Sequence, residues 1–393
     1  MTVASELPPL TPDEAAHSAT LVDLVRTRIE AARGWINFAE FMNLALYTPG
    51  LGYYSAGARK FGAAGDFVTA PEVAPVFSRC LAMQCAEVLR ELGPAARMLE
   101  LGAGSGVMAA DLLAELEQQG ALPAAYCILD LSADLRERQQ ETLARRVPHL
   151  LQRVHWLDGL PEPFEGLILA NEVLDALSVE RFAMRGGQVN ALGVSQDLGR
   201  LTLAEVRAGA RLEAAVRRIE RDRGAALPDG YESEVCLGLS SWLQSIAQCL
   251  ARGVLLFIDY GLPRREYYLA ERSNGTLLCH FRHRFHDDAL LHVGLQDITA
   301  WVDFTAVAEA AEEAGCEVAG YTTQAHFLIG CGLEQFVANV DGLELVERLN
   351  LSRQAMMLTL PGEMGERFKV IALAREYPAP LRGFALRDLR HTL

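Results

Sequence analysis

The chain has 393 residues, of which 50% are hydrophobic and 22% charged, so it holds enough apolar material for a large core and is not a disordered or fibrous protein. Its 36 basic and 51 acidic residues give a net charge of −15. That balance disfavours a nucleic-acid partner and favours a partner that presents basic groups.

Residues 1–20 are rich in Pro and Ala and are expected to be loosely ordered. Residues 1–17 hold no Lys or Arg, unlike a secretory or transit signal, and no stretch of the chain reaches the ~20 apolar residues that span a membrane. The eight Cys show neither Cys-x-x-Cys pairs nor zinc spacing, which indicates reduced thiols. We therefore expect a cytoplasmic protein without a membrane span.

Apolar spacing predicts helices over residues 21–46, in two segments, and over residues 73–92. Between them, residues 47–71 are rich in Gly and aromatic residues and have no period, and a loop of this length is usually functional or disordered. Residues 53–67 could close over a ligand as a lid, or pack as a static segment. We assign residues 1–92 to N-terminal helices and this Gly-rich lid loop.

Residues 97–175 alternate between short apolar strands and helices, which is typical of right-handed βαβ units and a parallel sheet. The expected elements are a strand at 97–102, a helix at 107–119, a strand at 126–132, a helix at 133–147, a strand at 153–158 and a strand at 166–171 that runs into a helix. The fold class is therefore α/β, with residues 93–182 forming the first half of the sheet.

Residues 183–235 are predicted to be an insertion, with an antiparallel ribbon around the RGGQ turn and a charged helix at 211–224. The Arg residues of that helix alternate with acidic ones, which indicates a solvated face, although a partner-docking surface is an alternative. Residues 236–393 are expected to complete the sheet. Its predicted elements are a helix at 238–250, a strand at 253–261, a helix at 302–315 and strands at 316–324 and 367–375.

The strongest motif is ELGAGSG, in which Glu100 precedes Gly102, Gly104 and Gly106 between a strand and a helix. Clustered glycines let the backbone approach a ligand closely, and the helix N-terminus favours an anion. A dinucleotide fingerprint needs its third glycine one position later. The spacing favours S-adenosylmethionine, with Glu100 near its cationic amine, while a dinucleotide site and a purely structural turn remain open.

Polar residues follow the next three predicted strands. Asp130 is placed to accept hydrogen bonds from two ribose hydroxyls, since capping of the following helix fits Ser132 or Asp134 better. Asp158 is placed to meet the adenine edge, or is only a turn residue. Substrate and cofactor of an open α/β sheet meet where its strands end. The set expected there, after the fourth strand, is Asn171, Glu172 and Asp175.

Together with these residues, the segments ANEVLDALSVERF, GDFVTAPEV, FIDYG, QDITAWVDFT and MGERFKVIAL resemble the MidA family over roughly residues 52–373. These are S-adenosylmethionine-dependent methyltransferases, and mitochondrial relatives methylate an arginine of a respiratory complex I subunit. The resemblance implies a class I, Rossmann-like, seven-stranded methyltransferase sheet and S-adenosylhomocysteine as product. This sequence departs from the family pattern at three positions: Asp130 (usually Glu), Ser178 (usually Pro) and Trp301 (usually His).

The resemblance implies that the methyl acceptor is an arginine side chain of a protein. Its guanidinium group is charged when it reaches the site, and a planar carboxylate can bind it through two parallel hydrogen bonds. Glu172 is the first candidate for a catalytic carboxylate and Asp175 the second. Asn171, Asp66 in the Gly-rich loop and the Asp259–Tyr260 pair are further candidates.

Other interpretations stay open. His280, His283 and His286 precede two Asp residues, but their spacing fits neither a helical nor a strand metal pair, so no metal is expected. Besides methyl transfer, we consider a nicotinamide-dependent oxidoreductase and a non-catalytic assembly factor that keeps the cofactor fold. The sequence does not indicate the oligomeric state.

Overall fold

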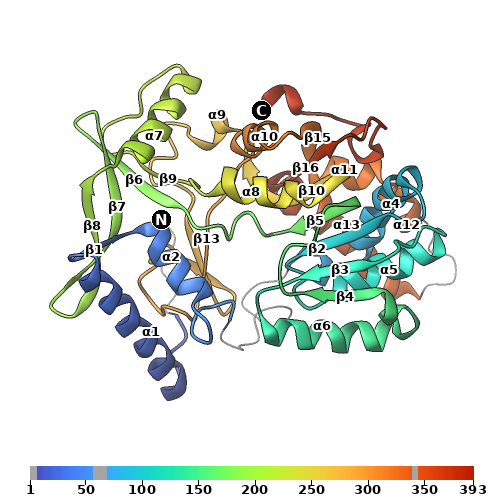
Figure 1. Ribbon diagram of the computed structural model, residues 1–393, viewed down its shortest axis with the longest axis horizontal. Helices are drawn as coiled ribbons and strands as arrows, with labels where there is room; N and C mark the ends of the chain where they lie inside the picture. The colour runs from blue at the N-terminus through green and yellow to red at the C-terminus, as the bar shows by residue number, and fades with distance from the viewer. Residues whose placement is uncertain (1–6, 56–68, 339–343) are drawn as a thin grey trace. The chain divides into compact units, whose positions relative to one another are not determined.

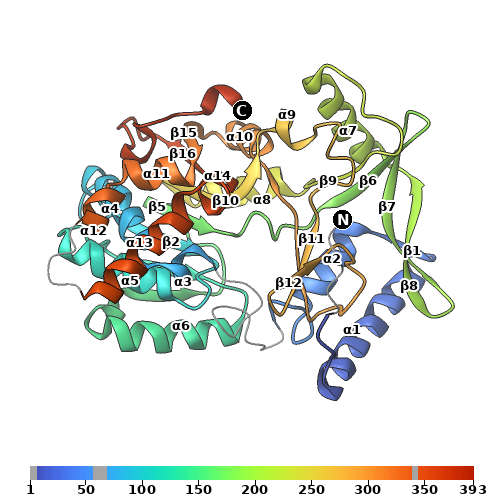
Figure 2. The same ribbon diagram turned by 180° about the vertical axis from the view of Figure 1, so that it is seen from behind.

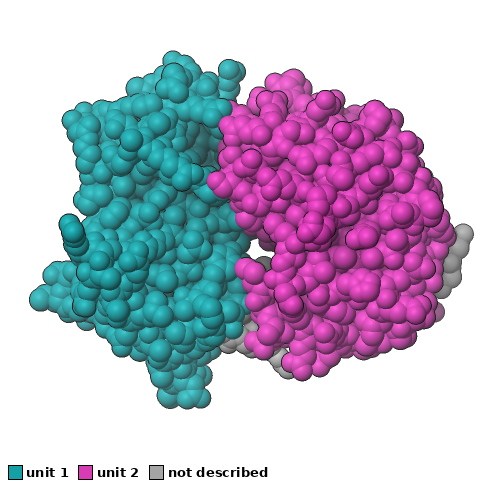
Figure 3. Space-filling model, viewed as in Figure 1, with its two compact units in different colours: residues 1–67, 175–239, 262–303 teal, residues 68–174, 240–261, 304–393 magenta. Residues whose placement is uncertain are grey.

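The computed structural model describes residues 7–55, 69–338 and 344–393. The chain forms two compact units, coloured in Figure 3. Unit 1 comprises residues 1–67, 175–239 and 262–303, and unit 2 comprises residues 68–174, 240–261 and 304–393. The chain therefore passes between the units five times, so neither unit is one continuous stretch of the sequence.

Unit 2 is built on a sheet whose strands lie in the order β15-β16-β10-β5-β2-β3-β4 (Figure 1). These strands are β2 (Arg97–Leu101), β3 (Tyr126–Leu129), β4 (Val154–Leu157), β5 (Phe164–Asn171), β10 (Leu250–Leu262), β15 (Glu317–Thr323) and β16 (Phe368–Arg375). The neighbours from β10 to β4 are parallel, whereas β16 is antiparallel to β10 and to β15. With the two-residue β14 (Val302–Asp303) the sheet has eight strands, so the expected α/β fold is confirmed but a count of seven is not.

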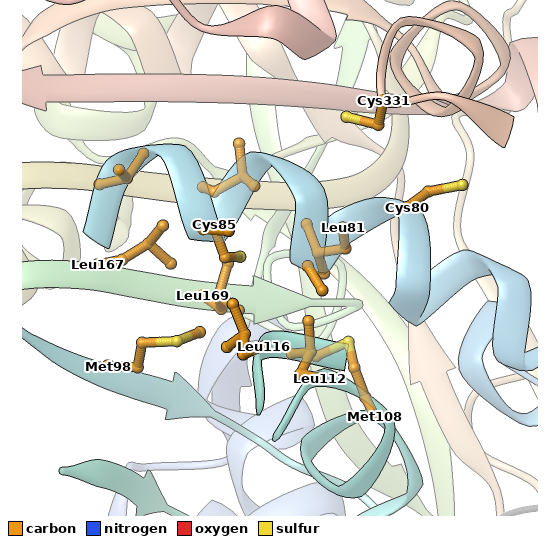
Figure 4. Close-up of a cluster of buried hydrophobic side chains, with 14 of the residues drawn as sticks. Cys80, Leu81, Cys85, Met98, Met108, Leu112, Leu116, Leu167, Leu169 and Cys331 are labelled. Carbon is orange, nitrogen blue, oxygen red and sulfur yellow. The ribbon is translucent and has the colours of Figure 1, made fainter. Parts of the chain in front are cut away.

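Helices cover both faces of this sheet (Figures 1 and 2). They are α3 (Ala70–Val73), α4 (Pro75–Leu92), α5 (Val107–Gln118), α6 (Ala133–Arg146), α8 (Leu239–Gln248), α10 (Phe304–Glu313), α11 (Gln324–Gly330), α12 (Leu333–Ala338), α13 (Leu345–Thr359) and α14 (Met364–Arg367). Side chains of α4 and α5 form one core with alternate residues of the strands, including Met98, Leu167 and Leu169 (Figure 4). On the opposite face, Trp242 of α8 packs against Phe257 of β10.

The strand and helix predictions for residues 97–158 are confirmed to within a few residues, because each strand is apolar and ends at a glycine or a polar residue. The sequence signals for helix starts also act as expected. The Ser132 hydroxyl caps α6 by accepting the N–H of Leu135 at 3.4 Å, and Gly106 precedes α5 in the left-handed region. The predicted helix after the fourth strand is wrong, since the residues after Asn171 form turns.

Unit 1 contains a five-stranded antiparallel sheet of order β1-β7-β6-β9, with β8 beside β7, and a three-stranded sheet of order β12-β11-β13. The strands of these two sheets are β1 (Trp35–Asn37), β6 (Glu180–Arg185), β7 (Gln188–Asp197), β8 (Arg200–Arg207), β9 (Glu232–Val235), β11 (Leu278–Phe281), β12 (Arg284–His286) and β13 (Asp297–Thr299). Its helices are α1 (Pro12–Ala31), α2 (Phe38–Tyr47), α7 (Ala210–Arg223) and α9 (Arg264–Tyr267). The predicted ribbon is the β6–β7 hairpin, and the predicted charged helix is α7.

Two expectations for the N-terminal region are wrong. Helix α1 begins at Pro12, inside the stretch expected to be loosely ordered, because Thr11 and Glu14 form a capping box. The second predicted helical segment starts with strand β1, and α2 begins only at Phe38, after the Asn37 cap. Within the described ranges, we find no helix with the length and hydropathy of a membrane span. All eight cysteines are free thiols.

Candidate functional site

The strand order of unit 2 reverses between β2 and β5. From β2 the chain continues outward to β3 and β4, whereas β5 is followed on its other side by β10. In open α/β sheets, ligands bind outside the carboxyl ends of the strands at such a switch point. The glycine motif follows β2 and the Asn171–Glu172 pair ends β5, so both predicted halves of the site start from this place.

The glycine loop after β2 needs its glycines for conformational reasons. Gly102, Gly104 and Gly106 have φ values of 64°, 54° and 81°, in the region that L-residues with a Cβ rarely adopt. A Cβ on Gly106 would lie 2.9 Å from the Cα of Gln139 on α6. The loop is therefore compact enough to bring its backbone and the start of α5 close to a ligand.

Glu100 lies at the base of this loop and is fully buried. The Tyr126 hydroxyl donates a hydrogen bond to its Oε2 at 2.6 Å, whereas its Oε1 has no hydrogen-bond partner among the described residues. Burial, together with the charge of Asp130, raises the pKa of Glu100 to about 7, although the Tyr126 hydrogen bond opposes the rise. A buried carboxylate with an unused oxygen suits a ligand that supplies a cationic donor.

Asp130 is buried and held by two donors. The backbone N–H of Ser132 donates to its Oδ1 at 3.0 Å, and Gln139 Nε2 donates to its Oδ2 at 2.9 Å. Gln139 also donates to the carbonyl of Gly104 at 3.1 Å and accepts the indole N–H of Trp156 at 3.0 Å. Because an indole N–H can only donate, the amide oxygen of Gln139 faces Trp156 and its nitrogen faces the other two groups.

Gln139 was not predicted as a site residue. It connects the glycine loop, the end of β3 and the side of β4 through one fully buried amide. The only sequence signal is its position on the predicted helix that follows Asp130, among Arg, Glu and Gln residues that are mostly exposed. A pattern of charge and spacing does not distinguish the one buried amide from its neighbours.

Asp158 follows β4, as expected, but its side chain is 94% exposed and forms an ion pair with Arg136 at 2.6 Å. Arg136 also donates to the carbonyl of Asp130 at 3.1 Å, so it links the ends of β3 and β4. Contact of Asp158 with an adenine edge stays a prediction.

The turn after β5 holds the first catalytic candidate. Glu172 has a φ of 55°, an unusual conformation for a residue with a Cβ, and its N–H donates to the carbonyl of Ile258 at 2.9 Å. The N–H groups of Val173 and Leu174 both donate to Asp259 Oδ2, at 3.1 and 2.9 Å. Asp259, a further catalytic candidate, is fully buried on β10, and its carboxylate holds the backbone of this turn.

The other three predicted catalytic residues are Asn171, Asp175 and Asp66. Asn171 ends β5 and donates from Nδ2 to Glu172 Oε1 at 3.1 Å. Asp175 belongs to unit 1, where it is buried and its carbonyl accepts the N–H of Ala300 at 3.1 Å. Asp66, like most of the predicted lid loop, lies outside the described residues.

The remaining motifs of unit 1 take separate places. His280 lies on β11 and His286 on β12, with His283 in the turn between them. Within residues 7–55, 69–338 and 344–393 we find no group of three His, Cys, Asp or Glu side chains that could hold a metal ion. Trp301, which departs from the family pattern, lies under the guanidinium of Arg272, 5.1 Å from the ring centroid.

The unit 2 site thus offers a glycine loop of left-handed backbone, a buried carboxylate with an unused oxygen and a second buried carboxylate one strand away. These groups fit a ligand that carries an amine and a ribose. A family model described as "Putative S-adenosyl-L-methionine-dependent methyltransferase" matches residues 80–322, more than half of the chain. The chain belongs to the MidA family of S-adenosylmethionine-dependent methyltransferases.

Individual proteins that are similar to this chain support the family assignment. A crystal structure of a Burkholderia thailandensis protein bound to S-adenosyl-homocysteine is 42% identical, with a TM-score of 0.94, and the match covers 99% of this chain and 100% of that one. The Drosophila melanogaster homolog of the mitochondrial protein arginine methyltransferase NDUFAF7 is 28% identical, over 92% of this chain and 86% of its own. The Mus musculus protein arginine methyltransferase NDUFAF7 is 29% identical, over 86% and 81%.

These findings establish S-adenosylmethionine as the cofactor and favour it over the dinucleotide that the glycine motif left open. The expected cytoplasmic localisation is contradicted, because the fly, mouse and human relatives are all named as mitochondrial proteins.

Proposed function

We propose that this methyltransferase transfers the methyl group to a nitrogen of an arginine side chain in a protein acceptor, with Glu172 as the carboxylate that binds the guanidinium. The observation that carries the proposal is the Glu172 turn. Its unfavourable φ is maintained by a fully buried carboxylate, and strain of this kind is concentrated at functional sites. The names of the NDUFAF7 relatives support arginine as the acceptor.

The cofactor supplies an electrophilic methyl group on a sulfonium, and the residues of the chain bind and align the reactants. Glu100 and Asp130 would hold the amine and the ribose hydroxyls, and the glycine loop would approach the ligand through its backbone. Glu172 would accept N–H bonds from the guanidinium, orient one nitrogen towards the methyl group and help to take up the proton released there. Asp259 acts through the turn and is a positioning residue.

Peptides test the acceptor directly. Incubation of the enzyme with radiolabelled S-adenosylmethionine and a library of short peptides, matched in pairs that differ only by Arg or Lys, should label the Arg members. Mass spectrometry of the labelled peptides should place the methyl group on the guanidinium. Labelling of Lys members, or of free small amines in competition, would contradict the proposal.

A further inference from the structure

Helix α13 carries a row of exposed apolar side chains. Leu345, Leu349, Met356 and Leu360, the last of them the C-cap residue, are 47–70% exposed, and we call these four residues the α13 stripe. They lie at positions i, i+4, i+11 and i+15. A turn of about 100° per residue places all four within roughly 60° of the helix circumference. The stripe therefore follows one side of the helix along its whole length.

The opposite side of α13 packs against the core of unit 2. Leu358 is fully buried in that core, and Leu351 packs against it. The side-chain amide of Gln324 donates to the carbonyl of Leu358 at 3.1 Å. Figure 2 shows α13 in front of the sheet. The stripe takes no part in this packing, so the core does not explain why these positions are apolar.

The size of the stripe limits what can cover it. Together with the neighbouring Val346, which is 67% exposed, its side chains can remove roughly 300–500 Å² from water. Contiguous apolar patches of this size often mark interaction sites. A stable protein pair, however, buries about 800 Å² on each partner. The stripe alone is too small for a permanent dimer interface, whereas it matches one face of a single helix that binds weakly.

The charges beside the stripe indicate which helix fits. Arg348 and Arg353 lie on its two sides. The acidic residues Glu344 and Glu347 lie towards the opposite side of the helix. In a helix pair, the residues that flank the apolar seam meet the flanks of the partner and determine partner choice. The net charge of −15 acts little here, since salt screens charges more than about 10 Å apart.

The same features argue against two other occupants. Two copies of α13 would place arginine beside arginine in either direction, because both flanks of each helix are basic. A helix that lies on a membrane presents a broad apolar face, typically with Trp or Phe, and α13 contains no aromatic residue. A helix with acidic flanks is therefore the occupant that the stripe favours.

We propose that the α13 stripe is a docking site for an amphipathic helix of another protein, one whose apolar seam is flanked by Glu or Asp. The site lies on unit 2 and uses none of the residues assigned to the cofactor or the acceptor. The inference therefore goes beyond the function proposed above and does not depend on it.

Helices displayed on phage test the proposal with the full chain. The library carries Leu, Ile or Met at the seam positions and Glu or Lys in equal shares at the flanking positions. Selection on the immobilised protein should enrich Glu at the flanks. A selected peptide should bind with a dissociation constant of roughly 1–100 µM by fluorescence anisotropy. The double substitution Leu349→Gln and Met356→Gln should weaken this binding at least about tenfold, because it removes the centre of the stripe.

Two further variants control this result. Leu269→Gln with Leu386→Gln changes two exposed apolar residues outside α13 and should alter the peptide affinity less than about twofold. Arg353→Glu should shift the preference from Glu-flanked towards Lys-flanked peptides. All variants should keep their affinity for S-adenosylhomocysteine, which shows that unit 2 is folded.

Four outcomes would overturn the proposal. The first two are equal enrichment of Lys at the flanks and undiminished peptide binding by the α13 double variant. The third is a dimer of the unaltered protein in sedimentation that becomes a monomer in the double variant, which would assign the stripe to a second copy. The fourth is cosedimentation with vesicles of phosphatidylcholine and phosphatidylglycerol that the double variant loses, which would assign the stripe to a membrane surface.

Discussion

The glycine loop after β2 and the turn after β5 leave neighbouring strands of one sheet, yet they are held in different ways. Gln139 holds the loop through side-chain hydrogen bonds to Gly104, Asp130 and Trp156, and the left-handed positions of the loop are all occupied by glycine. The turn is held by Asp259 through two backbone N–H groups, and it contains Glu172 in an unfavourable conformation.

The difference corresponds to the two tasks that we propose. A cofactor presents the same groups in every reaction cycle, and a satisfied, buried network can be built for it in advance. The carboxylate that meets an acceptor must project from the sheet edge, where regular secondary structure ends. We therefore expect changes at the loop to alter cofactor affinity and changes at the turn to alter methyl transfer.

The largest effect is expected for Glu172→Gly. Loss of the carboxylate should lower methyl transfer roughly 10²- to 10⁴-fold, while glycine relieves the positive φ and offsets the lost Asn171 hydrogen bond. We expect the free energy of unfolding in urea to stay the same or to rise by up to about 1 kcal/mol. Glu376→Gly is the matched control, because Glu376 has a φ of 49° at an exposed position after β16. The Glu376→Gly variant should keep the full rate of methyl transfer. A large fall in its rate would mean that the effect of Glu172→Gly is not specific to the turn after β5.

Asp259→Asn should separate the turn from the loop. Asn offers one acceptor oxygen where Asp259 accepts three backbone N–H bonds, from Val173, Leu174 and Tyr260. One or more buried donors lose their partner, at a cost of about 1–3 kcal/mol in unfolding free energy. Methyl transfer should fall more than about tenfold, with S-adenosylhomocysteine affinity changed less than about threefold by calorimetry.

A control and a contrary result sharpen this prediction. Asp388→Asn removes a half-buried carboxylate that also accepts a backbone N–H, that of Arg390, and it should affect neither transfer nor cofactor binding. If Asp259→Asn weakened cofactor binding as much as transfer, the turn and the loop would be one structure and the comparison would fail.

Gln139→Met is the corresponding change at the loop. It keeps the length of the side chain but leaves the Gly104 carbonyl, the Asp130 oxygen and the Trp156 N–H without their partner. We expect the dissociation constant of S-adenosylhomocysteine to rise about 10-fold or more. At saturating cofactor the transfer rate should stay near that of the unaltered enzyme. Gln140→Met, one residue along on the exposed face of α6, is the control, and a fall in the saturated rate would contradict the assignment.

The pH dependence of cofactor binding tests Glu100. Its pKa in the folded protein, about 7, lies above its ordinary value of 4.5, because burial disfavours the charge. The stability that this group contributes without ligand is therefore fully present below its ordinary pKa and is lost as pH rises through about 7. Binding of the cofactor ammonium needs the ionised Glu100 carboxylate. The affinity for S-adenosylhomocysteine should therefore increase with pH over the same range, by up to about tenfold per pH unit below the pKa of Glu100.

Calorimetry between about pH 5.5 and 8.5 measures this rise, and urea unfolding without ligand measures the opposite trend in stability. Glu100→Gln should remove both dependences. Binding of 5′-methylthioadenosine, which has no amine, should vary little with pH. An equal pH dependence for the two ligands would assign the proton to another group.

The sequence predicted the loop better than the turn, for a physical reason. Glycine spacing and apolar strands are local signals, so β2 to β5 and the positions of Glu100, Gly106 and Asp130 follow from short stretches of sequence. Val173 and Leu174 are apolar, and their sequence predicts a helix. Their N–H groups instead bond to Asp259, which is more than 80 positions away and whose contribution no local pattern contains.

The same limit applies to single buried residues. Gln139 lies in a helix whose other polar residues are mostly exposed, and its role depends on Trp156 and Gly104, which come from two other parts of the chain. Strand β8 and helix α13 also went unpredicted. The first adds an edge to the ribbon, and the second has apolar residues around its whole circumference, including exposed Leu345, Leu349 and Met356, so no periodicity marks it.

Asp158→Ala is expected to have the smallest effect. It tests whether the cofactor site extends as far as the end of β4. The Asp158 side chain is 94% exposed, and its pair with Arg136 contributes no more than about 1 kcal/mol to folding because water and salt screen it. If Asp158 only pairs with Arg136, S-adenosylhomocysteine affinity should change less than about twofold, and adenosine should behave in the same way. If Asp158 contacts the adenine, the affinities for both ligands should fall by a similar, larger factor, whereas the affinity for inosine, which lacks the amino group, should not fall.

Arg136→Met separates the two cases, because it removes the ion-pair partner of Asp158 but also removes the hydrogen bond to the Asp130 carbonyl. A loss of affinity in Arg136→Met without one in Asp158→Ala would show that the arginine supports the ribose carboxylate and that the cofactor edge ends at β3.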